Sequence, residues 1–193
     1  VDLALMRVRE AQVSTRWSSA SIPGIPSEPL PSDPEWSGGT LYKDIRIKEI
    51  NSSPEKVWQS VESIGGNNGY FSFDWAWEIR GILDRIVGGV GLRRGRRDPL
   101  HLNVGETLDF WRVEEKIPNN LLRLRAEMKM PGKAWLEFKV EQVDDQKSKL
   151  TQTAIFYPKG LAGHMYWWAI APFHVFVFPG MIKNLKKVVE ENK

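Results

Sequence analysis

The sequence MYWWAIAPFHVFVFPGMI, residues 165–182, is the most unusual stretch of this chain and the one that decides its fold. His174 is its only strongly polar residue, and three lysines follow it, at Lys183, Lys186 and Lys187. From Gly163 to about Glu191, the pattern predicts one long, apolar C-terminal helix. A helix of this kind must be buried against another apolar surface, which the rest of the chain is expected to supply.

That surface is predicted by the alternation of apolar and polar residues in four segments before the helix. Residues 106–116 alternate imperfectly, which predicts either a β-bulge or burial on both faces. The other three segments alternate cleanly, and the short turns between them indicate antiparallel hairpins. Their inner faces are expected to carry Leu122, Leu124, Ala126 and Met128; Ala134, Leu136, Phe138 and Val140; and Leu150, Gln152, Ala154 and Phe156.

The beginning of this domain predicts one more strand and two helices. Residues 42–50 alternate, with Ile45 and Ile47 expected on the buried face. A serine cap and an N1 proline begin one helix at Pro54, and a second helix is predicted over residues 73–86. An order of strand, two helices, antiparallel strands and a long terminal helix is typical of the α+β class.

Residues 1–40 are predicted to form an arm or linker, the tail of a preceding domain. Residues 1–20 carry a short amphipathic pattern, and residues 21–40 contain five prolines, which exclude a helix there. Because the first residue is Val1 rather than methionine, we expect this chain to be cut from a longer one. The ligand-binding domain is predicted to occupy residues 41–193.

Composition excludes several classes of protein. With 41% hydrophobic and 26% charged residues, the 193-residue chain is in the ordinary globular range. It has no cysteine, which excludes disulfides, thiolate zinc sites and thiol nucleophiles. A net charge of +3 does not indicate a nucleic-acid-binding protein. The absence of cysteine fits a reducing compartment and no signal peptide is visible, so a cytoplasmic location is predicted.

Four strings of residues occur in a fixed order along the chain: GYFSFDW at 69–75, GGVGLRRGRR at 88–97, DFWRV at 109–113 and GLAGHMYWW at 160–168. Together with the predicted element order, they make residues 41–182 resemble an uncharacterised bacterial family of the START/polyketide-cyclase (SRPBCC) superfamily. The resemblance implies a helix-grip fold, in which a curved antiparallel sheet wraps around a long C-terminal helix. It also implies a cavity between sheet and helix for an apolar or amphipathic small molecule.

Members of this family are often fused behind an NmrA-like, atypical short-chain-dehydrogenase domain that binds NAD(P). Residues 1–20 resemble the end of such a domain, so NAD(P) is expected upstream and no cofactor in the present domain. The resemblance carries over no catalytic residues.

A surplus of aromatic residues, 9 Trp, 8 Phe and 4 Tyr, suits a lined pocket as well as a packed core. Trp135 alternates with the inner residues and is expected on the other face of the sheet. Gln152 is the one polar residue of an inner set, and either orients a ligand or is a satisfied buried amide. The predicted ligand-binding residues are Phe110, Leu124, Met128, Phe138, Gln152, Phe156, Trp167, Trp168 and Phe173.

The arginine-rich string could hold an anionic head group through Arg94 or Arg97. The alternative is a structural turn in which these arginines pair with carboxylates. A dinucleotide-binding loop is disfavoured, because such a loop needs a buried strand before it and a helix immediately after it, whereas Asp98-Pro99 follows here.

The sequence gives only weak candidates for catalysis. Asp74 beside Trp75 could act as an acid or base in an apolar pocket, although an ion pair with Arg80 or a helix cap explains it as well. His164 is the second candidate. The three histidines show no metal-ligand spacing, so no metal site is predicted.

The apolar terminal stretch is near the lower length for spanning a bilayer. The strands before it need a cover, however, and prolines interrupt it, so no transmembrane segment is predicted. Peripheral membrane contact through exposed tryptophans stays open.

The predicted function is the binding of an apolar or amphipathic small molecule between sheet and terminal helix, in the service of a fused NAD(P)-dependent domain. One alternative is an enzyme of the cyclase, isomerase or hydrolase type that uses Asp74, His164 or Arg97. Another is a structural appendage with a filled core and no ligand.

Overall fold

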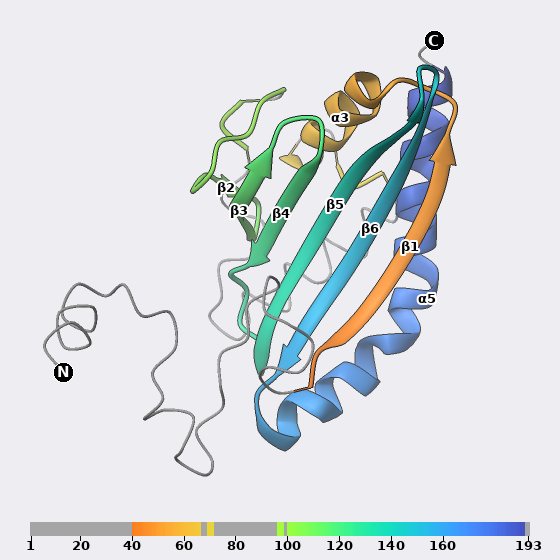
Figure 1. Cartoon of the computed structure of the whole chain (residues 1–193). Coiled ribbons are helices and arrows are strands. Elements are labelled where there is room, and N and C mark those ends of the chain that lie inside the picture. The colour runs from red at the N-terminus through yellow and green to blue at the C-terminus, as the bar shows by residue number, and fades with distance from the viewer. Residues whose placement is uncertain (1–39, 67–68, 72–95, 99, 192–193) are drawn as a thin grey trace, which may run out of the picture. The chain divides into compact units, whose positions relative to one another are not determined.

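The computed structural model describes residues 40–66, 69–71, 96–98 and 100–191 (Figure 1). The predicted helix over residues 73–86 and the arm up to residue 39 lie outside these residues. All described elements belong to one compact unit, Leu41–Lys193. In chain order they are β1 (Tyr42–Ile50), α3 (Pro54–Glu62), β2 (Thr107–Leu108), β3 (Trp111–Ile117), β4 (Leu121–Ala126), β5 (Gly132–Asp144), β6 (Lys147–Pro158) and α5 (Gly160–Glu191).

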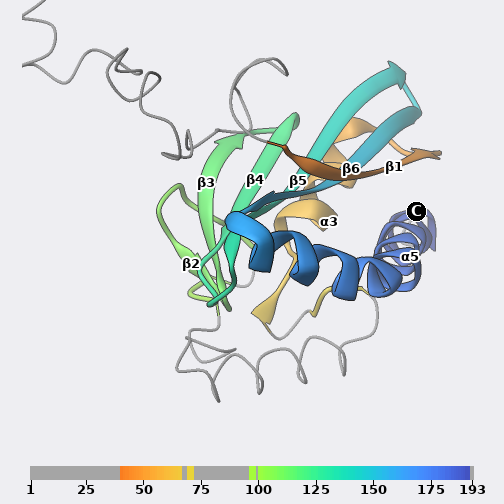
Figure 2. The same cartoon turned by 90° about the horizontal axis from the view of Figure 1, so that it is seen from below.

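The strands form one antiparallel sheet in the order β1-β6-β5-β4-β3-β2. From β2 to β6 each strand pairs with its neighbour in sequence, as in a series of hairpins, and β1 closes the other edge by pairing with β6. Figure 2 shows α3 and α5 on the same face of this sheet. The predicted α+β fold, an antiparallel sheet covered by a long C-terminal helix, is confirmed.

The main core lies between the inner face of the sheet and these two helices. The alternation predicted for β4, β5 and β6 is confirmed, because Leu122, Leu124, Leu136, Phe138, Val140 and Leu150 are all buried in this core. The second half of α5 contributes Phe178, Met181, Ile182, Leu185 and Val189. Trp135 lies in a separate buried cluster with Ile155 and Tyr157, so its predicted place on the other face is also confirmed.

The start of α5 lies very close to the β4–β5 connection, and Gly163 makes this possible. A Cβ atom at Gly163 would lie 2.5 Å from the carbonyl oxygen of Pro131 and 2.8 Å from Pro158. The helix then continues through Pro172 and Pro179 without a break. The predicted interruption at these prolines is therefore wrong: each proline removes one backbone hydrogen bond, and α5 is bent along its length (Figure 2), but it stays one helix.

Residues 106–116 are two strands rather than the single imperfect strand that was predicted. The chain turns at Asp109, whose φ of 53° is in the left-handed region, and Leu108 then pairs with Trp111. The Asp109 carboxylate accepts hydrogen bonds from Tyr70 Oη at 2.8 Å and from the Gly66 N–H at 3.0 Å. The apolar residues on both sides of this turn are buried, as the imperfect alternation indicated.

The predicted orientation of β1 is wrong. Ile45 and Ile47 are 54% and 56% exposed, whereas Tyr42, Asp44 and Arg46 are partly buried. Successive side chains of a strand alternate between faces, so one face of β1 must be polar and the other apolar. In this domain the polar face is the one that contacts α5.

Candidate functional site

A row of polar side chains runs along the inner face of β1. Tyr42, Asp44 and Arg46 are each two residues apart and therefore share a face. Across the β1–β6 ladder they stand opposite Phe156, Ala154 and Gln152, respectively. Two histidines of α5 contact the first two members of this row.

The first contact joins Tyr42 to His164. The Tyr42 hydroxyl lies 2.8 Å from His164 Nδ1, a hydrogen bond whose direction depends on the imidazole tautomer. The Tyr42 ring also stacks on Trp167, with centroids 4.9 Å apart and an angle of 11° between the planes. Trp167 stacks in turn on Phe156, at 5.9 Å and 8°. Three aromatic rings from β1, α5 and β6 thus form one continuous stack.

The second contact joins Asp44 to His174. The Asp44 carboxylate accepts hydrogen bonds from Arg46 Nε at 2.6 Å and Nη2 at 3.2 Å. His174 Nδ1 lies 3.8 Å from Asp44 Oδ2, and its ring meets Trp167 and Phe178 edge to face, with centroids 4.9 and 4.6 Å away. The imidazole therefore lies between a carboxylate and two aromatic walls.

Gln152 of β6 lies opposite the last residue of this row, Arg46, and is the most unusual residue of the site. Its side chain is only 1% exposed, and it lies opposite Arg46 on one side and Phe138 on the other. Neither its Oε1 nor its Nε2 has a hydrogen-bond partner among the described residues. A buried amide without partners costs about 1–3 kcal/mol, and native interiors rarely leave one unpaired. Such a group is suited to bind a polar atom of a guest molecule.

Seven of the nine predicted ligand-binding residues are in the interior of the domain. Phe110, Leu124, Met128, Phe138, Gln152, Phe156 and Trp167 are all buried. Trp168 and Phe173, which were also expected to face the interior, are 68% and 61% exposed. This is a correction with a simple cause: Trp167 and His174 are two helical turns apart and face the sheet, so Trp168 and Phe173 lie largely in solvent. Trp168 keeps one contact with the site, because its ring meets the Tyr42 ring edge to face with centroids 6.3 Å apart.

Among the catalytic and anion-binding candidates that the structure describes, His164 joins this site and Arg97 does not. Arg97 is 71% exposed and pairs with Glu106 at 2.5 Å, as the structural alternative for the arginine-rich string suggested. Arg94 and Asp74 lie outside the described residues. Arg96 has a structural contact, since its Nη1 donates to the Ile64 carbonyl at 2.7 Å; burial lowers the pKa of this guanidinium despite the nearby carboxylates.

Sequence reasoning missed four members of the site: Tyr42, Asp44, Arg46 and His174. The three on β1 looked like the solvated face of an amphipathic strand, and isoleucines on the opposite face strengthened that interpretation. His174 was visible as the only strongly polar residue of an apolar helix, which is the one signal that pointed here. Within the described part of the chain, no three His, Asp or Glu side chains cluster as metal ligands would.

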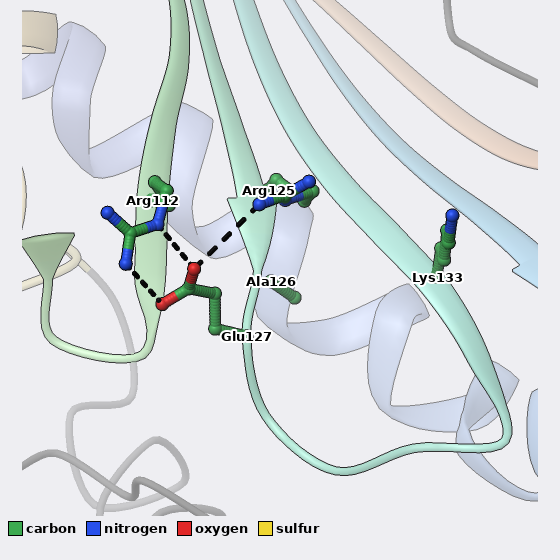
Figure 3. Close-up of a pocket in the computed structure, with 5 residues that line it drawn as sticks. All are labelled: Arg112, Arg125, Ala126, Glu127 and Lys133. Atoms are coloured by element: carbon green, nitrogen blue, oxygen red, sulfur yellow. Dashed lines mark hydrogen bonds and ion pairs between the residues drawn. The ribbon is translucent and has the colours of Figure 1, made fainter. Parts of the chain in front are cut away.

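A separate hollow of about 440 Å³ lies over β3, β4 and β5 (Figure 3). It is lined by Arg112, Arg125, Ala126, Glu127 and Lys133. Arg112, Arg125 and Lys133 alternate with the inner residues of their strands, so the hollow is on the outer face of the sheet. Glu127 pairs with both arginines there, which makes the hollow a solvated ion-pair cluster rather than part of the inner site.

The sequence matches the model of a protein family over residues 36–181, and that family is described as "Protein of unknown function (DUF2867)". No curated protein matches the sequence.

Several solved structures are similar to this chain. They include norcoclaurine synthase from Thalictrum flavum, with 10% identity, a TM-score of 0.48 and coverage of 80% of this chain and 96% of that one. The ZhuI aromatase/cyclase from Streptomyces sp. R1128 has 12% identity, a TM-score of 0.44 and coverage of 78% and 94%. XoxI from Bacillus cereus has 17% identity, a TM-score of 0.43 and coverage of 76% and 94%.

Proposed function

The chain belongs to the family described as Protein of unknown function (DUF2867), and we propose that its domain binds an amphipathic small molecule between the inner face of the sheet and α5. The observation that carries this proposal is Gln152, a buried amide with no partner among the described residues. A guest that hydrogen-bonds to this amide would recover the free energy that its burial costs.

The surroundings of Gln152 indicate what kind of guest would fit. Phe138 lies beside it in the sheet, and Trp167 and Phe156 form the aromatic stack, so the guest is expected to have an apolar, ring-containing part. Arg46 stands directly opposite Gln152 on β1 and pairs with Asp44, which favours a hydroxyl or carbonyl group on the part of the guest that lies there. The cavity predicted from the sequence is part of this proposal.

Titration with 8-anilinonaphthalene-1-sulfonate, an aromatic fluorophore with one anionic group, tests the proposal. We expect saturable binding that weakens at least fivefold in Gln152→Leu, because the substitution removes the only polar group of the inner β6 face next to Phe138. Gln146→Leu, in an exposed turn, and Phe176→Ser, on the outer side of α5, are matched controls that should bind as the original chain does.

Absence of saturable binding would contradict the proposal. So would binding that survives Gln152→Leu but is lost in Phe176→Ser, because the probe would then occupy the exterior of α5. Native mass spectrometry gives an independent reading: a molecule retained by the original protein should be lost from Gln152→Leu at the same collision energy.

A second candidate function, acid–base catalysis on the bound molecule, is favoured by the two histidine contacts. Imidazole accepts and donates protons near neutral pH, and the Asp44 carboxylate is placed to stabilise a positively charged His174. The reaction class would be proton abstraction and return, as in an isomerase or cyclase. If the bound molecule exchanges a carbon-bound proton for deuterium in ²H₂O, His174→Asn should slow the exchange at least a hundredfold while leaving binding within about threefold.

We also propose that this domain serves an NAD(P)-binding domain that precedes it in a longer cytoplasmic protein. The support is the resemblance of residues 1–20 to the end of such a domain. The intact mass of the native protein tests this, since a mass near 22.1 kDa would leave no room for another domain.

A further inference from the structure

The outward side of the first half of α5 is apolar and exposed to solvent. Half of the twelve large apolar side chains that are exposed among the described residues fall between positions 161 and 176 of this helix. They are between 58% and 76% exposed, and we call them the outer stripe: Leu161, Met165, Trp168, Phe173, Val175 and Phe176. Soluble domains rarely leave so many large apolar side chains exposed together.

The outer stripe is continuous along the helix. Leu161, Met165 and Trp168 follow one another at intervals of four and three residues, and Phe176 extends the row two turns further. The buried residues that contact the sheet, among them Trp167 and Phe178, occupy the opposite side, and Trp168 is at the border, where its edge also meets Tyr42. The packing of the helix on its own sheet therefore leaves the outer stripe uncovered.

Charge is arranged at the two ends of this surface. No Asp, Glu, Lys or Arg occurs from Gly160 to Ile182. Lys159 and Lys183, just beyond this stretch, are both exposed, and neither side chain pairs with a carboxylate within the described part of the chain. At 1.5 Å per residue they stand about 36 Å apart along the helix. The surface is thus an apolar strip with an unneutralised cation at each end.

A second copy of the chain does not fit this arrangement. If two outer stripes paired side by side along their length, an antiparallel pair would place Lys159 of one copy beside Lys183 of the other, and a parallel pair would place identical lysines together. Like charges in contact destabilise such pairings. The complementary partner is one that is apolar in its interior and anionic at its surface.

We propose that the outer stripe docks on an anionic membrane surface, with α5 lying in the plane of the membrane. Trp168, Phe173 and Phe176 would enter the interfacial region, and Lys159 and Lys183 would contact lipid phosphates. By length and mean hydropathy, 1.3, α5 could also cross a membrane, and it is the one helix of the described residues that could. Crossing would require its other side to leave the sheet, with loss of the core contacts of Met181, Ile182 and Leu185.

Co-sedimentation with vesicles tests the proposal. One set of vesicles is pure phosphatidylcholine and the other contains about 30% phosphatidylserine, which gives the negative surface potential that attracts lysines. We expect binding to the anionic vesicles that falls at least tenfold in Trp168→Ser/Phe176→Ser. The matched control is Ile45→Ser/Ile47→Ser, which removes two apolar side chains of similar exposure from the outward face of β1 and should bind within twofold of the original.

The lysines are tested separately with Lys159→Glu/Lys183→Glu, which should lose at least fivefold in affinity for the anionic vesicles and little for the neutral ones. All these substitutions are at exposed positions, so thermal unfolding is expected to be nearly unchanged and reports on folding. Equal binding by the outer-stripe variant and the β1 control would overturn the proposal, as would no binding to either vesicle. A concentration-dependent dimer that Trp168→Ser abolishes would overturn it in favour of a second copy.

Discussion

Glu62 and Gln152 are both polar side chains in the interior of this domain, and they differ in how their polar atoms are satisfied. Glu62 is 5% exposed and accepts hydrogen bonds from Trp58 Nε1 at 2.8 Å and from the Leu102 N–H at 3.1 Å, and its carboxylate also contacts the Lys116 ammonium group. Gln152 is 1% exposed, and neither polar atom of its amide has a hydrogen-bond partner among the described residues.

The contrast separates a structural use of a buried polar group from a functional one. The Glu62 carboxylate, at the end of α3, forms hydrogen bonds with residue 102 and with β3. All of its polar contacts therefore join one part of the domain to another. The Gln152 amide joins no described elements, and its burial lowers the free energy of unfolding. Proteins retain such a local loss of stability at functional sites. Two opposite changes in stability are therefore expected when these residues are replaced.

The largest change in stability is expected for Glu62→Ala. The substitution leaves two buried N–H donors without their acceptor and removes the carboxylate partner of the half-buried Lys116, which keeps its hydrogen bond to the Leu102 carbonyl, so we expect a loss of about 2–4 kcal/mol in the free energy of unfolding. Urea denaturation at neutral pH measures this. Glu62→Gln, which preserves the shape and part of the hydrogen bonding, should lose less. A loss below about 1 kcal/mol for Glu62→Ala would contradict the structural role.

The pH dependence of stability provides a second measurement on the same group. Burial raises the pKa of the Glu62 carboxyl, but the hydrogen bonds from Lys116, Leu102 and Trp58 outweigh it and leave the pKa below its ordinary value. A carboxyl whose pKa is lower in the folded state stabilises the fold above its unfolded-state pKa of about 4.3, and that contribution is lost as the pH falls through the folded-state pKa. The difference in stability between the original chain and Glu62→Gln should therefore shrink in acid.

The next effect has the opposite sign. Gln152→Leu replaces an unpaired buried amide with an apolar side chain of similar size, so we expect the free energy of unfolding to rise by about 1 kcal/mol in the absence of a ligand. Thermal unfolding should move a few degrees upward. Gln142→Leu, at an exposed position of β5, is the matched control and should change stability by less than about 0.5 kcal/mol.

A loss of stability in Gln152→Leu would show that the amide has a structural partner, and Gln152 would then belong with Glu62. The comparison also requires that the gain in stability and the loss of probe binding occur in the same variant. A variant that gains stability and still binds the probe would separate the two observations.

The sequence predicts those parts of the fold in which buried residues are apolar. The strands β4, β5 and β6 could be predicted because most of their buried inner residues are apolar, with Ser148 and Gln152 of β6 as exceptions. The long helix could be predicted because no other element is apolar enough to cover that face. In both cases the buried residues are the apolar ones. The spacing of apolar residues, every second residue in a strand or every 3.6 residues in a helix, therefore shows which residues are buried.

The candidate site could not be predicted in the same way, because at β1 burial and hydrophobicity do not coincide. Its polar residues face α5 and its isoleucines face solvent, so the periodicity was correct and the assigned face was wrong. The outer stripe of α5 shows the same departure, since Trp168 and Phe173 are apolar and exposed. A single sequence gives the period of an element, but which face is inward depends on the tertiary partner.

The smallest change in stability is expected at an ion pair that is partly exposed to solvent. Arg112 and Glu127 face each other at the outer hollow, with their side chains 35% and 18% exposed, and the guanidinium Nη2 donates to the carboxylate at 3.1 Å (Figure 3). Water can replace either partner there, so Glu127→Ala should cost less than about 1 kcal/mol, and less again at high salt.

A double-mutant cycle with Arg112→Ala and Glu127→Ala should give a coupling energy of about 0.2–1 kcal/mol. The equivalent cycle on Glu62 and Lys116 should give a larger coupling, because the buried Glu62 carboxylate cannot recover its hydration in the interior. If the two couplings were equal, pairing rather than burial would set the cost of a polar side chain in this domain. The unpaired amide of Gln152 would then no longer be a sign of a missing guest, because its isolation would cost the fold almost nothing.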